Sequence, residues 1–206
     1  MDESEARASE TSDREKRRKA LLTSLDVRKF EIDLFWKRSL FFWGFLALTF
    51  VIYGTTKKEF PNGAMPLAAA SFGTICSLCW HLVNRGSKYW QENWETKVGQ
   101  LEEEFIGTLF GDLTGTQRKR MWSAWRYSVG KITLALSAFV GILWLLIFLN
   151  ESYRLLSVYL FQDIESHKQI PMAMKGLVIF LLTVISIPII LVSTKTSQKP
   201  EESKSQ

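Results

Sequence analysis

Cysteine and histidine, which often carry redox and metal chemistry, are scarce in this sequence. Cys76 and Cys79 form a C-x-x-C pair, the spacing of a redox dithiol. Redox dithiols lie at exposed helix N-termini, whereas this pair lies inside an apolar run. We therefore expect both cysteines to pack within a helix rather than to react.

Other catalytic or ligand-binding patterns are equally sparse. His81 and His167 stand 86 positions apart, which makes a zinc site improbable. The glycine-rich residues 107–116, GTLFGDLTGT, lack the Lys-Ser/Thr of a phosphate-binding loop and predict a turn. The sequence therefore predicts no enzyme, no catalytic residue, no metal and no cofactor, and we expect no nucleic acid partner.

Weakly polar side chains recur at helical spacing around the cysteines. Ser71, Thr74 and His81 share one face of the predicted helix. Small residues at such spacing usually let helices pack closely, while in a ring the same face could line a central lumen. Both interpretations stay open. For His81 we expect a hydrogen-bonded side chain rather than a pH switch.

Four apolar blocks must position these residues. The protein has 206 residues, 47% of them hydrophobic, and each block of 18 to 20 residues lacks Asp, Glu, Lys and Arg. A helix rises about 1.5 Å per residue, so each block matches the roughly 30 Å hydrocarbon core of a bilayer. The sequence predicts an all-α membrane protein with four transmembrane helices. The blocks are residues 39–56, 64–83, 132–149 and 176–194.

The basic residues predict the orientation of these helices. Residues 1–38 hold ten Lys and Arg, the connection 84–131 holds eight, and the tail 195–206 holds three. The two remaining loops hold five together. Because cytoplasmic loops carry the excess of basic residues, we expect both termini and the 84–131 connection in the cytoplasm. The first 34 residues contain no apolar signal region, so the first block should remain as an anchor.

The segments outside the blocks differ in composition. Residues 1–20 carry mixed charge and few apolar side chains, which predicts a disordered tail. Its terminal basic run either attracts anionic lipid or only reflects the excess of basic residues on the cytoplasmic side. Residues 21–38 predict a juxtamembrane amphipathic helix. The turn residues of loop 57–63 make the first two spans a hairpin over 39–83, while 150–175 forms an outer loop between spans three and four within 132–194. The tail 195–206 is expected to be disordered. The apolar face of the amphipathic helix comprises Leu22, Leu25, Ile32 and Trp36.

The connection 84–131 predicts a helical collar that continues from the second span. Apolar residues from Trp90 to Leu109 recur every three or four positions, and Gly86 is the point where the helix could be interrupted. Aromatic residues and Arg are enriched at interface hot spots, so we expect this region to contact a second copy. Packing within the same chain is the alternative. The predicted interface residues are Asn84, Arg85, Lys88, Trp90, Trp94 and Glu95.

Two strings carry a resemblance to a known family. DLFWKRSLFFWGFLALTF (Asp33–Phe50) and NRGSKYWQENWETKVGQLEEEFIGTLF (Asn84–Phe110) resemble the RipA family of small bacterial inner-membrane proteins. That family is described as octameric, so the resemblance implies a homo-octamer in the bacterial inner membrane. The architecture is also similar to octameric pores that accompany some RNA-targeting CRISPR effectors, although their Arg-x(4–6)-His motif is absent.

These features predict a homo-oligomeric ring that acts as a gated pore or conduit, opened by movement of the collar. The alternative is a non-conducting scaffold or adaptor that recruits cytoplasmic or envelope-biogenesis proteins. The expected partners are therefore further copies of the chain, membrane lipid and a cytoplasmic protein.

Overall fold

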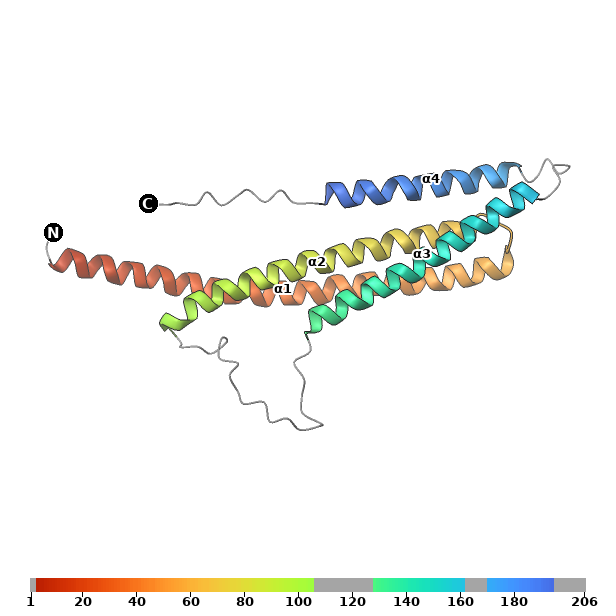
Figure 1. Cartoon of the computed structure of the whole chain (residues 1–206). Coiled ribbons are helices and arrows are strands. Elements are labelled where there is room, and N and C mark those ends of the chain that lie inside the picture. The colour runs from red at the N-terminus through yellow and green to blue at the C-terminus, as the bar shows by residue number, and fades with distance from the viewer. Residues whose placement is uncertain (1–2, 106–127, 162–169, 195–206) are drawn as a thin grey trace, which may run out of the picture. The chain divides into compact units, whose positions relative to one another are not determined.

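The computed structural model of the chain describes residues 3–105, 128–161 and 170–194, and no strand occurs in these ranges. Each of the four apolar blocks lies in a helix long and apolar enough to cross a membrane. The predicted all-α fold with four transmembrane helices is therefore confirmed. The helices are α1 (Glu3–Glu59), α2 (Met65–Phe105), α3 (Val129–Phe161) and α4 (Ile170–Ser193) (Figure 1).

The helices are divided between two compact units. Unit 1 comprises Met1–Phe41 and Leu82–Leu136, and unit 2 comprises Phe42–His81 and Ser137–Gln206. Helices α1, α2 and α3 each contribute a segment to both units, whereas α4 belongs to unit 2 alone. The two units are described separately below.

Unit 2 contains the hydrophobic core, and α2 is its most buried helix. In the most apolar stretch of α2, 56% of the residues are buried, against 17% in α1, 22% in α3 and 11% in α4. The outer faces of the other three helices therefore remain apolar and exposed, as expected for surfaces that meet lipid or another subunit. The buried core residues are Leu46, Leu67, Ala70, Cys76, Trp80, Trp144, Phe148 and Leu155.

Unit 1 pairs α1 with the collar segment of α2 in antiparallel fashion. The Arg38 Nη1 donates to Ser87 Oγ at 3.2 Å, and Arg28 Nη2 lies 3.7 Å from Glu95 Oε1. The contact made by the earlier residue of α1 is to the later residue of α2, so the two helices run in opposite directions. Among the described residues of this unit, those buried are Leu21, Ser24, Phe35, Ser39, Asn84, Ser87, Val98 and Glu102.

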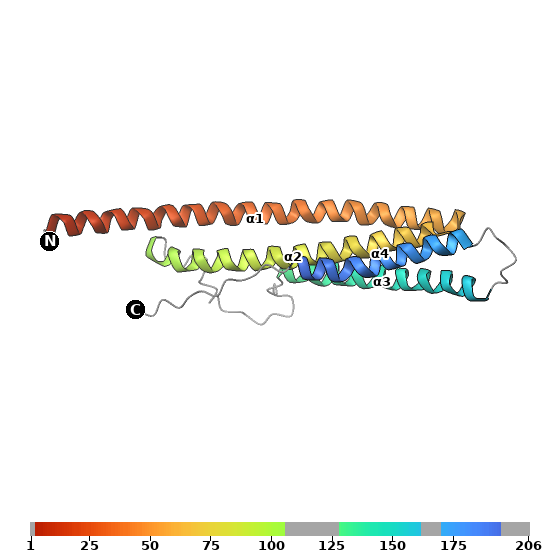
Figure 2. The same ribbon diagram turned by 90° about the horizontal axis from the view of Figure 1, so that it is seen from above.

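The N-terminal segment corrects one prediction. Helix α1 begins at Glu3 and runs without interruption to Glu59, so the predicted disordered tail 1–20 and the separate helix 21–38 belong to one helix (Figure 2). The segment is rich in Glu, Ala, Arg and Lys, which have high helix propensity. Ion pairs one turn apart add to this: Lys16 with Asp13 at 2.9 Å and Lys19 with Glu15 at 3.3 Å.

The packed face of α1 in unit 1 also differs from the predicted one. Leu22 is 54% exposed and Trp36 is 48% exposed, although both belong to the predicted apolar face. Their neighbours Leu21 and Phe35 are buried instead. Serines share the packed face, because small residues let helices approach closely, so hydrophobicity alone does not mark it. Ile32 is exposed as well and Leu25 is half-buried, so most of the predicted apolar face is not packed within unit 1.

The remaining helix ends extend the predicted spans. Helix α2 continues through Gly86 without a break. Helix α3 continues to Phe161 and α4 begins at Ile170, so residues 150–161 and 170–175 of the predicted outer loop 150–175 are helical. The hairpin turn is present, with the Gly63 N–H donating to the Phe60 carbonyl at 2.9 Å. The predicted turn at 107–116 and the tail 195–206 lie outside the described residues.

Candidate functional site

The weakly polar face of α2 lies against α3 inside unit 2. Ser71 and Thr74 are both buried. The Thr74 Oγ1 is 2.8 Å from the Ala70 carbonyl of its own helix and 3.1 Å from the Trp144 carbonyl of α3. These contacts place Thr74 in a helix–helix seam within one subunit.

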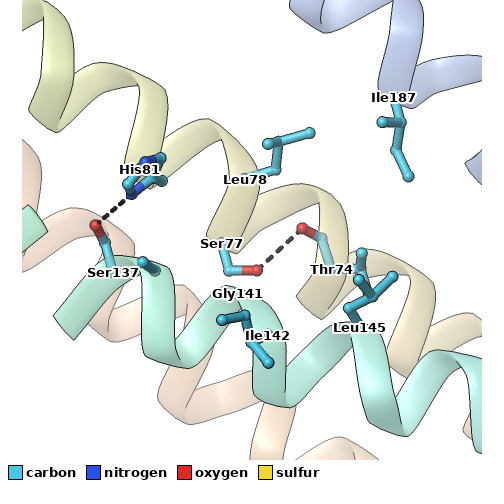
Figure 3. Close-up of a pocket in the computed structure, with 10 residues that line it drawn as sticks. Thr74, Ser77, Leu78, His81, Ser137, Gly141, Ile142, Leu145 and Ile187 are labelled. Atoms are coloured by element: carbon cyan, nitrogen blue, oxygen red, sulfur yellow. Dashed lines mark hydrogen bonds between the residues drawn. The ribbon is translucent and has the colours of Figure 1, made fainter. Parts of the chain in front are cut away.

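His81 closes the same seam one turn beyond Ser77. Its Nδ1 lies 3.0 Å from Ser137 Oγ of α3 (Figure 3), as expected for a hydrogen-bonded histidine. The Nε2 atom has no hydrogen-bond partner in the described part of the chain. A groove of about 240 Å³ opens beside this pair, between α2, α3 and α4. It is lined by Thr74, Ser77, Leu78, His81, Ser137, Ala138, Gly141, Ile142, Leu145 and Ile187.

Three of the predicted interface residues make contacts within unit 1. Asn84 is 1% exposed, and its Nδ2 has no partner among the described residues. Lys88 pairs with Glu92 of the same helix at 3.2 Å. Glu95 pairs with Arg28 of α1 at 3.7 Å. These residues therefore take part in packing and ion pairing inside the subunit.

Of the other predicted interface residues, two are exposed and one is half-buried. Arg85 is exposed, and Trp90 is 50% exposed with its ring edge-to-face on Tyr89 at 5.6 Å. We call Arg85, Tyr89 and Trp90 the collar face. Trp94 is half-buried, and the Lys97 ammonium lies 4.7 Å from its ring centroid. The structure thus buries Asn84 alone of the predicted set; Lys88 and Trp94 are half-buried, and Arg85, Trp90 and Glu95 are exposed.

A buried carboxylate in unit 2 was not predicted. Glu151 has no exposed side-chain surface. Its Oε1 accepts hydrogen bonds from Tyr53 Oη at 2.8 Å and from Lys57 Nζ at 2.6 Å. Its Oε2 accepts from Arg154 Nε at 2.7 Å. Buried charges are normally paired in this way, because an isolated one is very costly. We call these four residues the charged cluster.

The charged cluster also holds the hairpin between α1 and α2. Arg154 Nη1 lies 3.4 Å from Asn62 Oδ1, and Nη2 lies 3.4 Å from the Gly63 carbonyl. Sequence patterns did not predict the cluster, because Lys57 and Glu151 lie just outside apolar blocks one and three. The available signal for this ion pair was the presence of opposite charges just beyond spans one and three.

The other reactive side chains give no site in the described ranges. Cys76 and Cys79 are both free, and Cys76 is buried in the core of unit 2. No three His, Cys, Asp or Glu side chains among residues 3–105, 128–161 and 170–194 lie close enough to hold a metal ion.

Comparison with known proteins gives one match. A family model matches residues 19–153, about two thirds of the chain, which takes in α1 from Lys19, all of α2 and most of α3. No curated protein and no solved structure matches. With its four membrane-spanning helices and this match, the chain belongs to the octameric membrane protein family (8xMP).

Proposed function

We propose that the protein assembles as a homo-octameric ring in a bacterial inner membrane and acts there as a non-conducting scaffold for cytoplasmic proteins. The family description supports the octamer. The resemblance of Asp33–Phe50 and Asn84–Phe110 to RipA proteins supports the bacterial inner membrane. The proposal contains no enzymatic step.

The exposed surfaces support contacts between copies. The collar face presents two aromatic rings and a guanidinium, the side chains most enriched at interface hot spots. In unit 2, α1 exposes a run of large apolar side chains that a single subunit leaves uncovered. It consists of Trp43, Phe45, Leu48, Phe50, Val51 and Ile52. Lipid and neighbouring subunits together would cover such a surface.

The packing between α2 and α3 is the observation that favours a scaffold over a conduit. A lumen needs a polar wall, and the weakly polar face with Ser71 and Thr74 was the candidate for it. Both residues are buried, and Thr74 bonds to a carbonyl of α3 in the same unit. Ser71 and Thr74 are therefore used for packing within the subunit, and His81, the third residue of that face, contacts Ser137 of α3 beside the groove.

Unit 1 supports the recruiting role. Its α1 segment exposes mixed charges from Glu5 to Lys19 along a helix. By the distribution of Lys and Arg, we place this segment in the cytoplasm. A long charged helix there offers a regular surface for a cytoplasmic partner.

Flux through purified protein in liposomes tests the proposal. We expect particle mass to indicate eight copies and vesicles to remain sealed to small ions, with and without Thr74→Val. Steady ion flux that Thr74→Val alters would overturn the scaffold role and establish a conduit lined by α2. A mass corresponding to one copy would overturn the ring.

A further inference from the structure

We propose that the groove between α2, α3 and α4 of unit 2 binds one acyl chain of a membrane phospholipid, with the glycerol ester of that chain at His81. The inference depends on the membrane location of these helices and not on the choice between scaffold and conduit.

The size of the groove suits part of one phospholipid acyl chain. Its volume of about 240 Å³ lies below the roughly 300–1,000 Å³ of pockets that enclose whole small molecules. Its lining includes the small residues Ser77, Ala138 and Gly141, and a Cβ added at Gly141 would come into ordinary contact with Ser77 Oγ at 3.7 Å. A slender, flexible hydrocarbon suits such a space better than a helix of another protein.

The lining has one polar end. Figure 3 shows His81 and Ser137 facing one another, with Ile142, Leu145 and Ile187 bordering the groove away from this pair. No Asp, Glu, Lys or Arg of residues 3–105, 128–161 or 170–194 lines it. The groove therefore matches a molecule that is apolar along its length and weakly polar at one end.

His81 supplies the polar contact. Because its Nδ1 contacts Ser137 Oγ, a neutral ring protonated at Nε2 can accept from the serine and donate outward. Its Nε2 has no partner in the described ranges, and an ester carbonyl is an acceptor of suitable polarity. The absence of charge in the lining favours the ester over the phosphate as the group held here.

Helix α4 forms only one edge of the groove. It contributes Ile187 to the lining, and just 11% of its most apolar stretch is buried. An acyl chain can therefore enter the groove from the lipid side past α4, which makes few packing contacts. The same exposure would let another copy approach, which is the main competing occupant.

Photocrosslinking in vesicles tests the inference. The full chain is reconstituted in phosphatidylethanolamine vesicles with a phosphatidylethanolamine probe that carries a diazirine midway along one acyl chain. We expect labelling to concentrate on Leu78, Ile142 and Leu145 and to saturate as the probe fraction rises. Labelling that rises linearly and spreads over all exposed apolar faces would overturn the site, as would a disulfide formed between two copies of an Ile142→Cys variant.

A pair of matched variants tests whether the acyl chain of the probe lies in the groove. Ala138→Phe fills the groove, whereas Ala135→Phe adds the same ring to the exposed side of α3. We expect the first to lower saturable labelling at least about tenfold and the second to leave it unchanged. Equal labelling in both would overturn the site. If Ala138→Phe does not fold, the saturation curve of the unmodified protein still decides.

A further variant tests the polar end. His81→Leu keeps an apolar lining and removes the donor. We expect the affinity for the probe, measured from the saturation of labelling, to fall about three- to tenfold, which is the effect of losing one hydrogen bond. An unchanged affinity would overturn the assignment of the ester to His81.

Discussion

The indole of Trp144 lies directly against Gly73, so closely that a Cβ added to the glycine would overlap the ring. The tryptophan has no exposed surface and also contacts Phe50 at a centroid distance of 4.4 Å. The fit between α2 and α3 therefore depends on one missing methyl group. This contact fixes the separation at which Thr74 reaches its carbonyl partner on α3.

We expect Gly73→Ala to destabilise the protein by about 1–3 kcal/mol, the usual cost of overpacking a core. The rigid indole cannot swing aside as a flexible side chain would. Thermal unfolding in detergent measures the effect. Gly54→Ala is the matched control, because nothing lies within 4 Å of an added Cβ there. The control should be neutral or gain up to about 1 kcal/mol from helix propensity. Equal losses in both variants would contradict the packing argument.

The charged cluster gives a second expectation for stability. Glu151→Gln keeps the side-chain shape but leaves Lys57 and Arg154 without their shared counter-charge. We expect a loss of about 2–3 kcal/mol, because hydrogen bonds to a buried charge are among the stronger ones. Chemical denaturation of the purified protein provides the measurement.

Two further variants attribute this loss to the cluster. Lys58→Met changes an exposed neighbour and should alter stability by less than about 0.5 kcal/mol. The double variant of Lys57→Met and Glu151→Gln should lose less than the sum of its parts, with a coupling of about 0.5–3 kcal/mol. Strict additivity would show that the two groups do not interact.

Composition was sufficient to predict the four spans and the hairpin. A run of 18 or more apolar residues without charge has few other solutions in lipid, so apolar blocks predict helices well. Asn62 and Gly63 likewise predicted the turn. Both inferences depend on local chemistry, which a single sequence contains in full.

The packed faces could not be predicted in the same way. In unit 1 the contact between α1 and α2 uses Ser24, Asn84 and Ser87, all buried, while Leu22 and Trp36 face outward. The buried face of unit 1 mixes apolar residues such as Leu21, Phe35 and Val98 with these small or polar ones, so apolar periodicity alone did not identify it. The charged cluster escaped prediction because its members are distant in sequence and meet only in the fold.

The orientation of the chain is directly testable. The Lys and Arg distribution predicts that α1 residues near the N-terminus and the 57–63 turn lie on opposite sides of the membrane. In intact cells, a membrane-impermeant maleimide should label Lys58→Cys and not Lys16→Cys. Native Cys76 is buried and Cys79 is half-buried, so their background labelling should be low. The reverse pattern would place the termini outside.

Substitutions on the exposed and buried sides of the collar should affect assembly and folding separately. Trp90 is 50% exposed, whereas Val98 is 2% exposed within unit 1. We expect Trp90→Ala to reduce the oligomer to smaller species, because truncating an aromatic hot spot typically costs 2 kcal/mol or more of binding, on the order of a thirtyfold loss of affinity. Its subunit stability should be nearly unchanged.

Val98→Ala should show the opposite pattern. Removing buried methyl groups costs about 1 kcal/mol or more of stability, while the collar face stays intact. Light scattering in mild detergent reports oligomer mass, and circular dichroism on heating reports stability. Should Trp90→Ala keep the full mass while Val98→Ala dissociates, the subunit contact lies on the side of α2 that this structure assigns to α1. The opposite result places the contact between copies on Arg85, Tyr89 and Trp90.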